Sequence, residues 1–199
     1  MKINKRFIFL ILACAFILVS IYFINLVYAK YLTSADGTAA IPIAKWNIIV
    51  NNQTIKENAD ISNTIVPVFP GNEYIAANII APTATGYFDL NFDCTGVDVA
   101  FKYDITISNN ENSAVKDLVT TGYSIDGGAT IPVETIGAPI SDTFSLNATN
   151  KTRTIRIFIE WNDDAETATM NNVDDTMSTI GSSSEAKLDV NVLFTQVAG

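Results

Sequence analysis

The sequence predicts an all-β protein: an antiparallel β-sandwich of the jelly-roll or Greek-key type, preceded by an N-terminal apolar leader helix. Three observations support this prediction. Long segments alternate between apolar and polar residues, turn residues recur between these segments, and almost no helical periodicity follows the leader. Alternation with a period of two is typical of strands that bury one face in a core and expose the other to solvent.

The leader begins with the basic hexapeptide MKINKR and continues as an uncharged run from Phe7 to Val27. A basic segment, an apolar segment and small residues before the cut define a secretory signal peptide. Val27-Tyr28-Ala29 supplies the small residues, so we expect cleavage between Ala29 and Lys30. The apolar run of 21 residues is also long enough to span a bilayer, so an uncleaved anchor is the alternative. Both interpretations place the rest of the chain outside the cytoplasm.

The leader (residues 1–29) is followed by an N-terminal extension (30–44) and by a segment that predicts one β-sandwich domain (45–199). Three of the 12 basic residues lie in the leader, so 21 acidic and nine basic side chains remain after it, a net charge of −12. Such a surface repels nucleic acid and anionic lipid, so we expect no nucleic-acid partner and membrane contact only through the leader. Cys94 is the one cysteine after the leader, which excludes an intramolecular disulfide there.

The clearest strands are residues 87–94 and 97–108, and the Thr95-Gly96 pair between them predicts that the two form a hairpin. Alternation also predicts strands at 153–161 and 187–194. The Asp126-Gly127-Gly128 turn predicts a second hairpin over residues 123–133. Further strands are expected at 44–50 and 73–80, and the one helical suggestion is a short turn at 112–119.

The chain contains no histidine, which excludes Ser–His and Cys–His nucleophile pairs and the H-E-x-x-H zinc site. Cys94 lies on the inward face of its strand, where an inert core thiol is expected. A hydrolase that uses two carboxylates remains an alternative, because it needs no histidine. No pair of acids stands out for that role, and we expect the protein not to be an enzyme and to carry no cofactor other than calcium.

A loop near the C-terminus, WNDDAETATMNNVDDT, gathers oxygen ligands of the kind that Ca²⁺ prefers. The spacing does not match an EF-hand, and a solvated acidic loop with Asx turns is the alternative. The candidate calcium ligands are Asp163, Asp164, Glu166, Asp174 and Asp175, with Asn171 and Asn172 beside them.

Several short motifs resemble the TasA/camelysin-like exported proteins of Gram-positive bacteria. These are the leader ending near YAKY, the segment ADGTAAIPIAKWNIIVNN, the segment YFDLNFDCTGVDVAFKYDI, and Ile159-Glu160-Trp161 followed by Asp175-Thr176 and Gly181. The motifs span most of the chain, but each is short. Asn162 directly follows the Glu-Trp pair, where members often carry a longer aromatic cluster. Camelysins are described as metalloproteases, and a chain without histidine offers no ordinary zinc ligands for that activity.

The resemblance implies a jelly-roll subunit of extracellular matrix or cell-surface fibres, with a leader cut by a SipW-type signal peptidase and other matrix proteins as partners. It also implies that residues freed by leader removal form a donor strand for the neighbouring subunit. Ile41, Pro42 and Ile43 suit that role, because the two isoleucines share one face and proline is tolerated in an edge strand. The alternative is that this segment forms the first strand of its own sandwich.

A second function class is a non-catalytic adhesin or carbohydrate-binding module, because β-sandwiches host both roles. Such modules usually stack sugar rings on exposed aromatic side chains. Trp46 and Trp161 are the candidates, although each lies in a strand pattern that is also consistent with a core position. A tryptophan exposed beside a groove would favour binding.

Overall fold

A computed structural model provides the structure of the 199-residue chain. It describes residues 5–31, 41–57, 59–133, 135, 137–163, 170–180 and 185–197, with residues 25–31 described in their backbone only. The chain divides into two compact units, residues 1–42 and 43–199, and each is treated by itself below.

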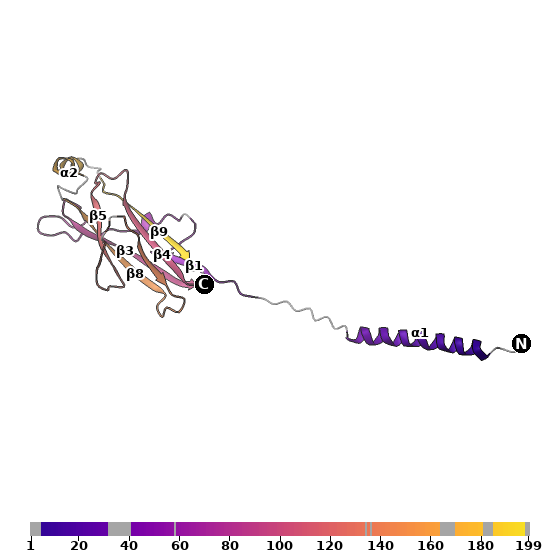
Figure 1. The fold of residues 1–199 in the computed structure, drawn as a ribbon. Coiled ribbons are helices and arrows are strands. Elements are labelled where there is room, and N and C mark those ends of the chain that lie inside the picture. The colour runs from indigo at the N-terminus through magenta and orange to yellow at the C-terminus, as the bar shows by residue number, and fades with distance from the viewer. Residues whose placement is uncertain are drawn as a thin grey trace. The chain divides into compact units, whose positions relative to one another are not determined.

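The N-terminal unit contains one helix, α1 (Lys5–Tyr31), and confirms the predicted apolar leader helix (Figure 1). The stretch Lys5–Ile24 has a mean hydropathy of 3.0 and is long and apolar enough to cross a membrane, a property that signal sequences share. The predicted cleavage point, Ala29–Lys30, lies in the last turn of this helix. Cleavage itself stays a prediction.

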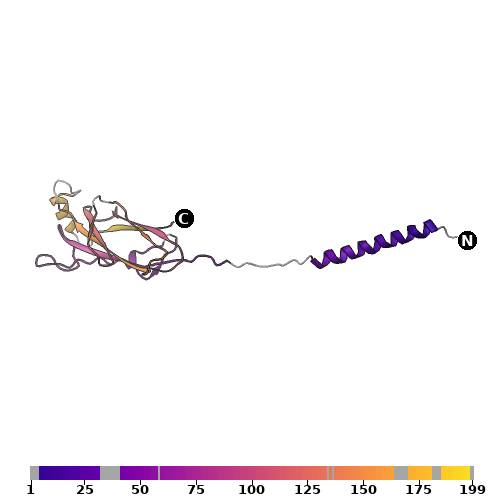
Figure 2. The same ribbon diagram turned by 60° about the horizontal axis from the view of Figure 1, so that its bottom comes forward.

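The second unit is a sandwich of two antiparallel sheets, which confirms the predicted fold class (Figures 1 and 2). The larger sheet has the strand order β2-β1-β3-β8-β5-β6 and the smaller has the order β7-β4-β9. Its elements are β1 (Trp46–Val50), β2 (Gln53–Thr54), a 3₁₀ turn η1 (Ser62–Thr64), β3 (Thr85–Val97), β4 (Phe101–Asn109), β5 (Leu118–Ile125), β6 (Ile131–Pro132), β7 (Ile140–Phe144), β8 (Thr152–Trp161), α2 (Asn172–Thr179) and β9 (Leu188–Gln196). The helix α2 lies at the end of the sandwich away from the C-terminus of β9 (Figure 2).

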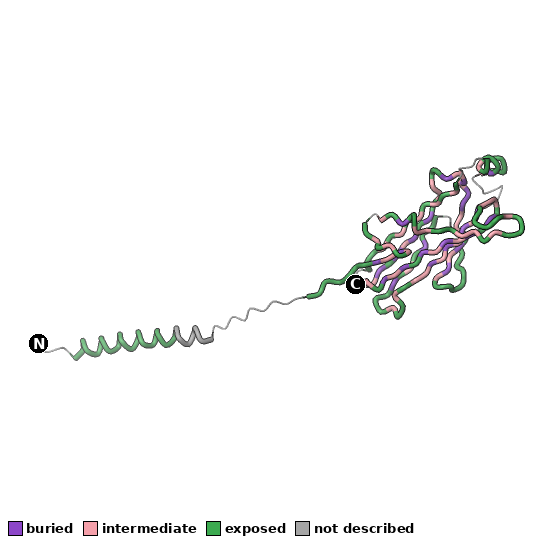
Figure 3. Tube along the Cα trace, turned by 180° about the vertical axis from the view of Figure 1, so that it is seen from behind, coloured by how far each residue is buried: buried purple, intermediate pink, exposed green. Residues whose placement is uncertain are grey.

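The core forms between the sheets from the inward residues of the alternating strands (Figure 3). On β3 and β8 every second side chain is buried, as the sequence pattern predicts. The fully buried large side chains include Phe88, Leu90, Phe92, Phe101, Tyr103, Ile105, Ile155 and Ile157. A second, smaller cluster of Val115, Leu118 and Trp161 closes the α2 end.

The hairpin predicted around Thr95-Gly96 is wrong. The strand β3 runs straight through that pair to Val97, and β4 belongs to the other sheet. Gly96 instead lies opposite Asn47 of β1, whose Cβ would be 3.0 Å from a Cβ placed on the glycine. The glycine therefore permits close approach of β1 and does not mark a turn. The hairpin around Asp126-Gly127 is confirmed, with both residues at positive φ and β5 paired to β6.

Two shorter predictions also fail. Residues 73–80 form turns and not a strand, because Asn72 Oδ1 accepts the backbone N–H groups of Tyr74 and Ile75 and holds the chain in a bend. Residues 112–119 form no helix, and β5 already begins at Leu118. The helix α2 was not predicted, although Asn171 caps its first turn in a reciprocal capping box with Asp174.

We predict that Ile157→Ala lowers the free energy of unfolding by about 2–5 kcal/mol, because it opens a cavity in the centre of the sandwich. Ile157 is fully buried on β8 between β3 and β5. Urea unfolding followed by circular dichroism measures the change. The control Val66→Ala, at a side chain that is 69% exposed, is expected to change stability by less than about 0.5 kcal/mol. Equal losses from both variants would contradict the assigned core.

Candidate functional site

The two sheets end in four edge strands, and they differ greatly in length. In the larger sheet the edges β2 and β6 have two residues each, and β6 includes Pro132. In the smaller sheet β7 has five residues and β9 has nine. Short edge strands and proline block further pairing, whereas a long strand presents a row of free N–H and C=O groups. Among the described residues, β9 is therefore the edge best suited to pair with another strand.

A cleft follows this edge of the sandwich. It consists of two adjoining parts of about 700 and about 570 Å³. Both parts are lined by Val190 and Asn191 of β9 and, on the opposite wall, by Ala59 and Ile61. Since neighbouring residues of β9 point to opposite faces, a cleft lined by both must open along the edge of the strand.

The core is incomplete beside β9. Its inward side chains, Leu188, Val190, Val192 and Phe194, are only partly buried, whereas the inward residues of β3, β4 and β8 are buried. Phe194 packs edge-on against Phe92, with ring centroids 5.3 Å apart, so β9 is held in the sandwich. The apolar space on its far side remains open to the cleft. An added strand with inward apolar residues would complete this part of the core.

The predicted donor residues Ile41, Pro42 and Ile43 lie just before Lys45, which is hydrogen-bonded to the sandwich. Lys45 is fixed by a pair of bonds to Asp98: its N–H donates to Asp98 Oδ2 and its carbonyl accepts from the Asp98 N–H, both at 3.0 Å. Ile41 and Ile43 are 84% and 92% exposed, respectively. Residues 32–40 lie outside the described part of the chain. Of the three predicted assembly residues, Ile41 and Ile43 therefore present most of their surface for contact.

The two tryptophans have different environments. Trp161 is 2% exposed and belongs to the small core cluster, so it cannot stack on a sugar. Trp46 is 46% exposed, packs edge-on against Phe101 at 5.7 Å between centroids, and lines the cleft beside β9. Trp46 thus has the exposure that a binding aromatic requires.

The described calcium candidates differ in their environments. Asp163 is exposed, while Asp164 and Glu166 lie outside the described residues. Asp174 takes part in the α2 capping box, and Asp175 is buried and accepts a 3.3 Å hydrogen bond from Trp161 Nε1. Within the described ranges no group of three acidic or thiol side chains could hold a metal ion by itself.

One buried acid near this loop escaped the sequence prediction. Asp117 is 4% exposed and lies just before β5, where its carbonyl accepts the N–H of Asn162 at 3.0 Å. The only sequence signal is a carboxylate among the apolar residues of segment 115–119. Because this segment was interpreted as a short helical turn, the carboxylate was not recognised as buried.

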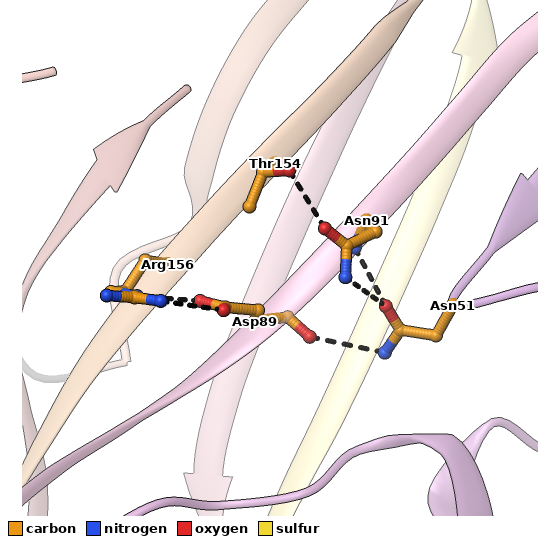
Figure 4. A network of polar contacts seen from close by, with 5 residues as sticks. All are labelled: Asn51, Asp89, Asn91, Thr154 and Arg156. Carbon is orange, nitrogen blue, oxygen red and sulfur yellow. Dashed lines mark hydrogen bonds and ion pairs between the residues drawn. The ribbon is translucent and has the colours of Figure 1, made fainter. Parts of the chain in front are cut away.

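The outer face of the larger sheet carries a network of paired polar groups (Figure 4). Asp89 accepts two hydrogen bonds from Arg156, at 2.8 and 2.9 Å, and Asn91 accepts one from the Thr154 hydroxyl. Asn51 accepts the Asn91 N–H at 2.8 Å and donates to the Asp89 carbonyl at 3.2 Å. These contacts join β3 and β8 to the turn that follows β1. The acids and amides of this face bond to one another, as expected of a sheet surface that stabilises strand pairing.

Comparison with known protein families finds no family that matches the chain. Comparison with curated proteins finds no relative. The resemblance to TasA/camelysin-like proteins therefore stays a prediction that rests on the motifs quoted above.

We predict that Cys94 does not react with thiol reagents at neutral pH while the protein is folded. Burial is the main cause that raises the pKa of this thiol to about 11, so almost no thiolate is present. The measurement is alkylation in a Cys14→Ser background, because Cys14 is exposed. Full labelling is expected only in urea. Rapid labelling of the folded chain would contradict the core position of Cys94.

Proposed function

We propose that the protein is a secreted structural subunit of extracellular matrix or cell-surface fibres. In this proposal the extension of one copy, centred on Ile41-Pro42-Ile43, adds as a strand to the β9 edge of the next copy. The observation that carries the proposal is the open cleft beside β9, which exposes a long strand edge and an unfilled part of the core.

The dimensions of donor and acceptor agree. An extended chain rises about 3.3 Å per residue, so β9, with nine residues, is about 30 Å long. Residues 30–44 can extend over about 50 Å, which is enough to cover this edge and leave a connection to the next domain. The extension carries one basic and one acidic residue, Lys30 and Asp36, so little charge has to enter the apolar cleft.

The side-chain pattern also agrees. Ile41 and Ile43 fall on one face of an extended strand and would enter the space between the sheets, where β9 leaves the core open. Pro42 lacks an N–H, and it is tolerated because the donated strand would itself be the new edge of the sheet.

Donation from one copy to the next uses two different surfaces of the chain. Such head-to-tail contacts do not close on themselves unless a rotation happens to make a ring, so they generate filaments. Removal of the leader by a signal peptidase would free the extension, and other matrix proteins with similar extensions could join the same edge.

We predict that residues 30–199 form species of high mass whose fraction grows with concentration, whereas residues 45–199 stay monomeric. Size-exclusion chromatography with light scattering measures this difference. Within the longer chain, Ile43→Asp is expected to prevent assembly, because a charge would enter the apolar cleft. The control Val66→Asp changes a similarly exposed side chain elsewhere and is expected to assemble normally.

A mixing experiment separates strand donation from other association. Val190→Lys places a long basic side chain in the cleft and blocks the proposed acceptor edge, while the apolar stem lies in the cleft and the ammonium group reaches solvent. Neither Ile43→Asp nor Val190→Lys should assemble alone, but an equal mixture should give heterodimers that grow no further. A fully monomeric residues 30–199, or high-mass species from residues 45–199, would refute the proposed strand donation.

A carbohydrate-binding module is the second candidate function, and the half-exposed Trp46 beside the cleft is the observation that favours it. The donated strand would cover the same cleft. The two functions therefore make opposite predictions about what changes the environment of Trp46.

We predict that the fluorescence of Trp46 shifts to shorter wavelength as residues 30–199 assemble, because the donated strand shields the ring from water. Trp161 is already buried, so the change reports on Trp46. Titration of residues 45–199 with oligosaccharides should leave the spectrum unchanged. A saturable shift with a glycan, lost in Trp46→Ala, would favour the binding module instead.

A further inference from the structure

The α2 end of the sandwich contains two buried carboxylates. Among the residues that the structure describes, Asp117 is 4% exposed and Asp175 is 5% exposed. Lysines near this end are engaged elsewhere: Lys116 Nζ donates to the carbonyls of Asn110 and Glu111, and Lys187 pairs with Glu185. Neither carboxylate has a basic partner in the described ranges.

Asp117 has one satisfied and one unsatisfied oxygen. Its Oδ2 accepts the N–H of Met170 at 2.7 Å. Its Oδ1 is buried and has no hydrogen-bond partner among the described residues. A buried carboxylate oxygen without a partner is strongly unfavourable, so buried acids are normally paired with a base or coordinate a cation.

Asp175 is connected to the same region through Trp161. Its Oδ1 accepts from the indole of Trp161, and Trp161 pairs with Leu118, the residue that follows Asp117. Burial raises the pKa of Asp175, and the negative charges of Asp163, Asp117 and Asp174 raise it further, against the lowering effect of the Trp161 hydrogen bond. Excess negative charge is thus concentrated around the Trp161 side chain.

We propose that this end of the sandwich binds a divalent cation, calcium, through the free Oδ1 of Asp117 and the carboxylate of Asp175. Calcium takes six to eight oxygen ligands, and water and backbone carbonyls would supply those beyond the two carboxylates. Because two protein carboxylates are few for a calcium site, the expected dissociation constant is about 10⁻⁴ to 10⁻³ M, the range of extracellular modules. The site is independent of the proposed strand donation.

The bound ion would fasten α2 to the sheets. Asp175 belongs to α2, and Asp117 precedes β5, so one cation bridges elements that are far apart in the sequence. It would also neutralise two charges that otherwise repel each other inside the fold. Calcium should therefore raise the thermal unfolding temperature of the protein.

Terbium luminescence tests this site on the full chain in detergent micelles, after treatment with a chelator. Terbium replaces calcium and emits when a nearby tryptophan transfers energy to it. Trp161 contacts Asp175, whereas Trp46 lies at the other end of the 13-residue strand β3, about 40 Å away. We expect sensitised emission that calcium displaces and that Trp46→Phe retains.

The variants Asp117→Asn and Asp175→Asn should each weaken terbium binding by about tenfold or more and abolish the stabilisation by calcium. The control Glu111→Gln removes an exposed acid and the same unit of charge, and it should leave both unchanged. Circular dichroism confirms that each variant is folded. Absence of sensitised emission would overturn the proposal, because no ion would be bound near Trp161. Equal weakening by all three variants would also overturn it, because it would indicate general attraction of the ion to an acidic protein.

Discussion

The inward side chains of β3 and β8 pack against those of β4, and the other elements depend on this contact. β3 and β8 pair through nine successive residues from Thr85 to Asp93, so their buried rows lie side by side in the larger sheet. The smaller sheet covers these rows with Phe101, Tyr103 and Ile105 of β4. The smaller sheet has three strands and ends at β9, and the inward side chains of β9 are only partly buried. The open cleft is thus a consequence of covering a six-stranded sheet with a three-stranded one.

Alternation in the sequence predicted β3, β4, β8 and β9, because each of them has one buried and one more exposed face. It missed β7, which adds Ile140 and Phe144 to the core, and the start of β5, which had been interpreted as a helical turn. Apart from the β5–β6 hairpin, which the Asp126-Gly127 turn marks, the sequence did not show which strands pair. Thr95-Gly96 looks like a hairpin turn, yet Gly96 is needed where Asn47 of β1 comes close, a contact between residues distant in the sequence. Trp46 and Trp161 occupy equivalent positions in their strand patterns, and only their place in the sheets exposes one and buries the other.

The candidate sites were also predictable to different degrees, because local patterns are visible in the sequence and contacts between distant residues are not. Ile41 and Ile43 stand out as apolar residues in a segment without a core pattern, so the proposed donor segment could be nominated from sequence. The proposed acceptor edge, β9, could not be nominated, because an edge is known only once the strand order is known. Likewise the acidic loop was visible by composition, but Asp117 is brought to it by tertiary structure from a different part of the chain.

The α2 end of the sandwich, which contains Asp117, is hydrogen-bonded to the residues that precede the edge strand β9. The loop of residues 110–117 bonds to the chain just before β9: the Ala114 N–H donates to the Glu185 carbonyl at 2.9 Å, and the Lys187 N–H donates to Ser113 Oγ at 2.8 Å. Leu188, the first residue of β9, packs against both core clusters. The loop that ends at Asp117 therefore supports the residues from which β9 starts. A strand must be held in an extended register before another strand can pair with it, so these contacts support the β9 edge on which the proposed strand donation depends.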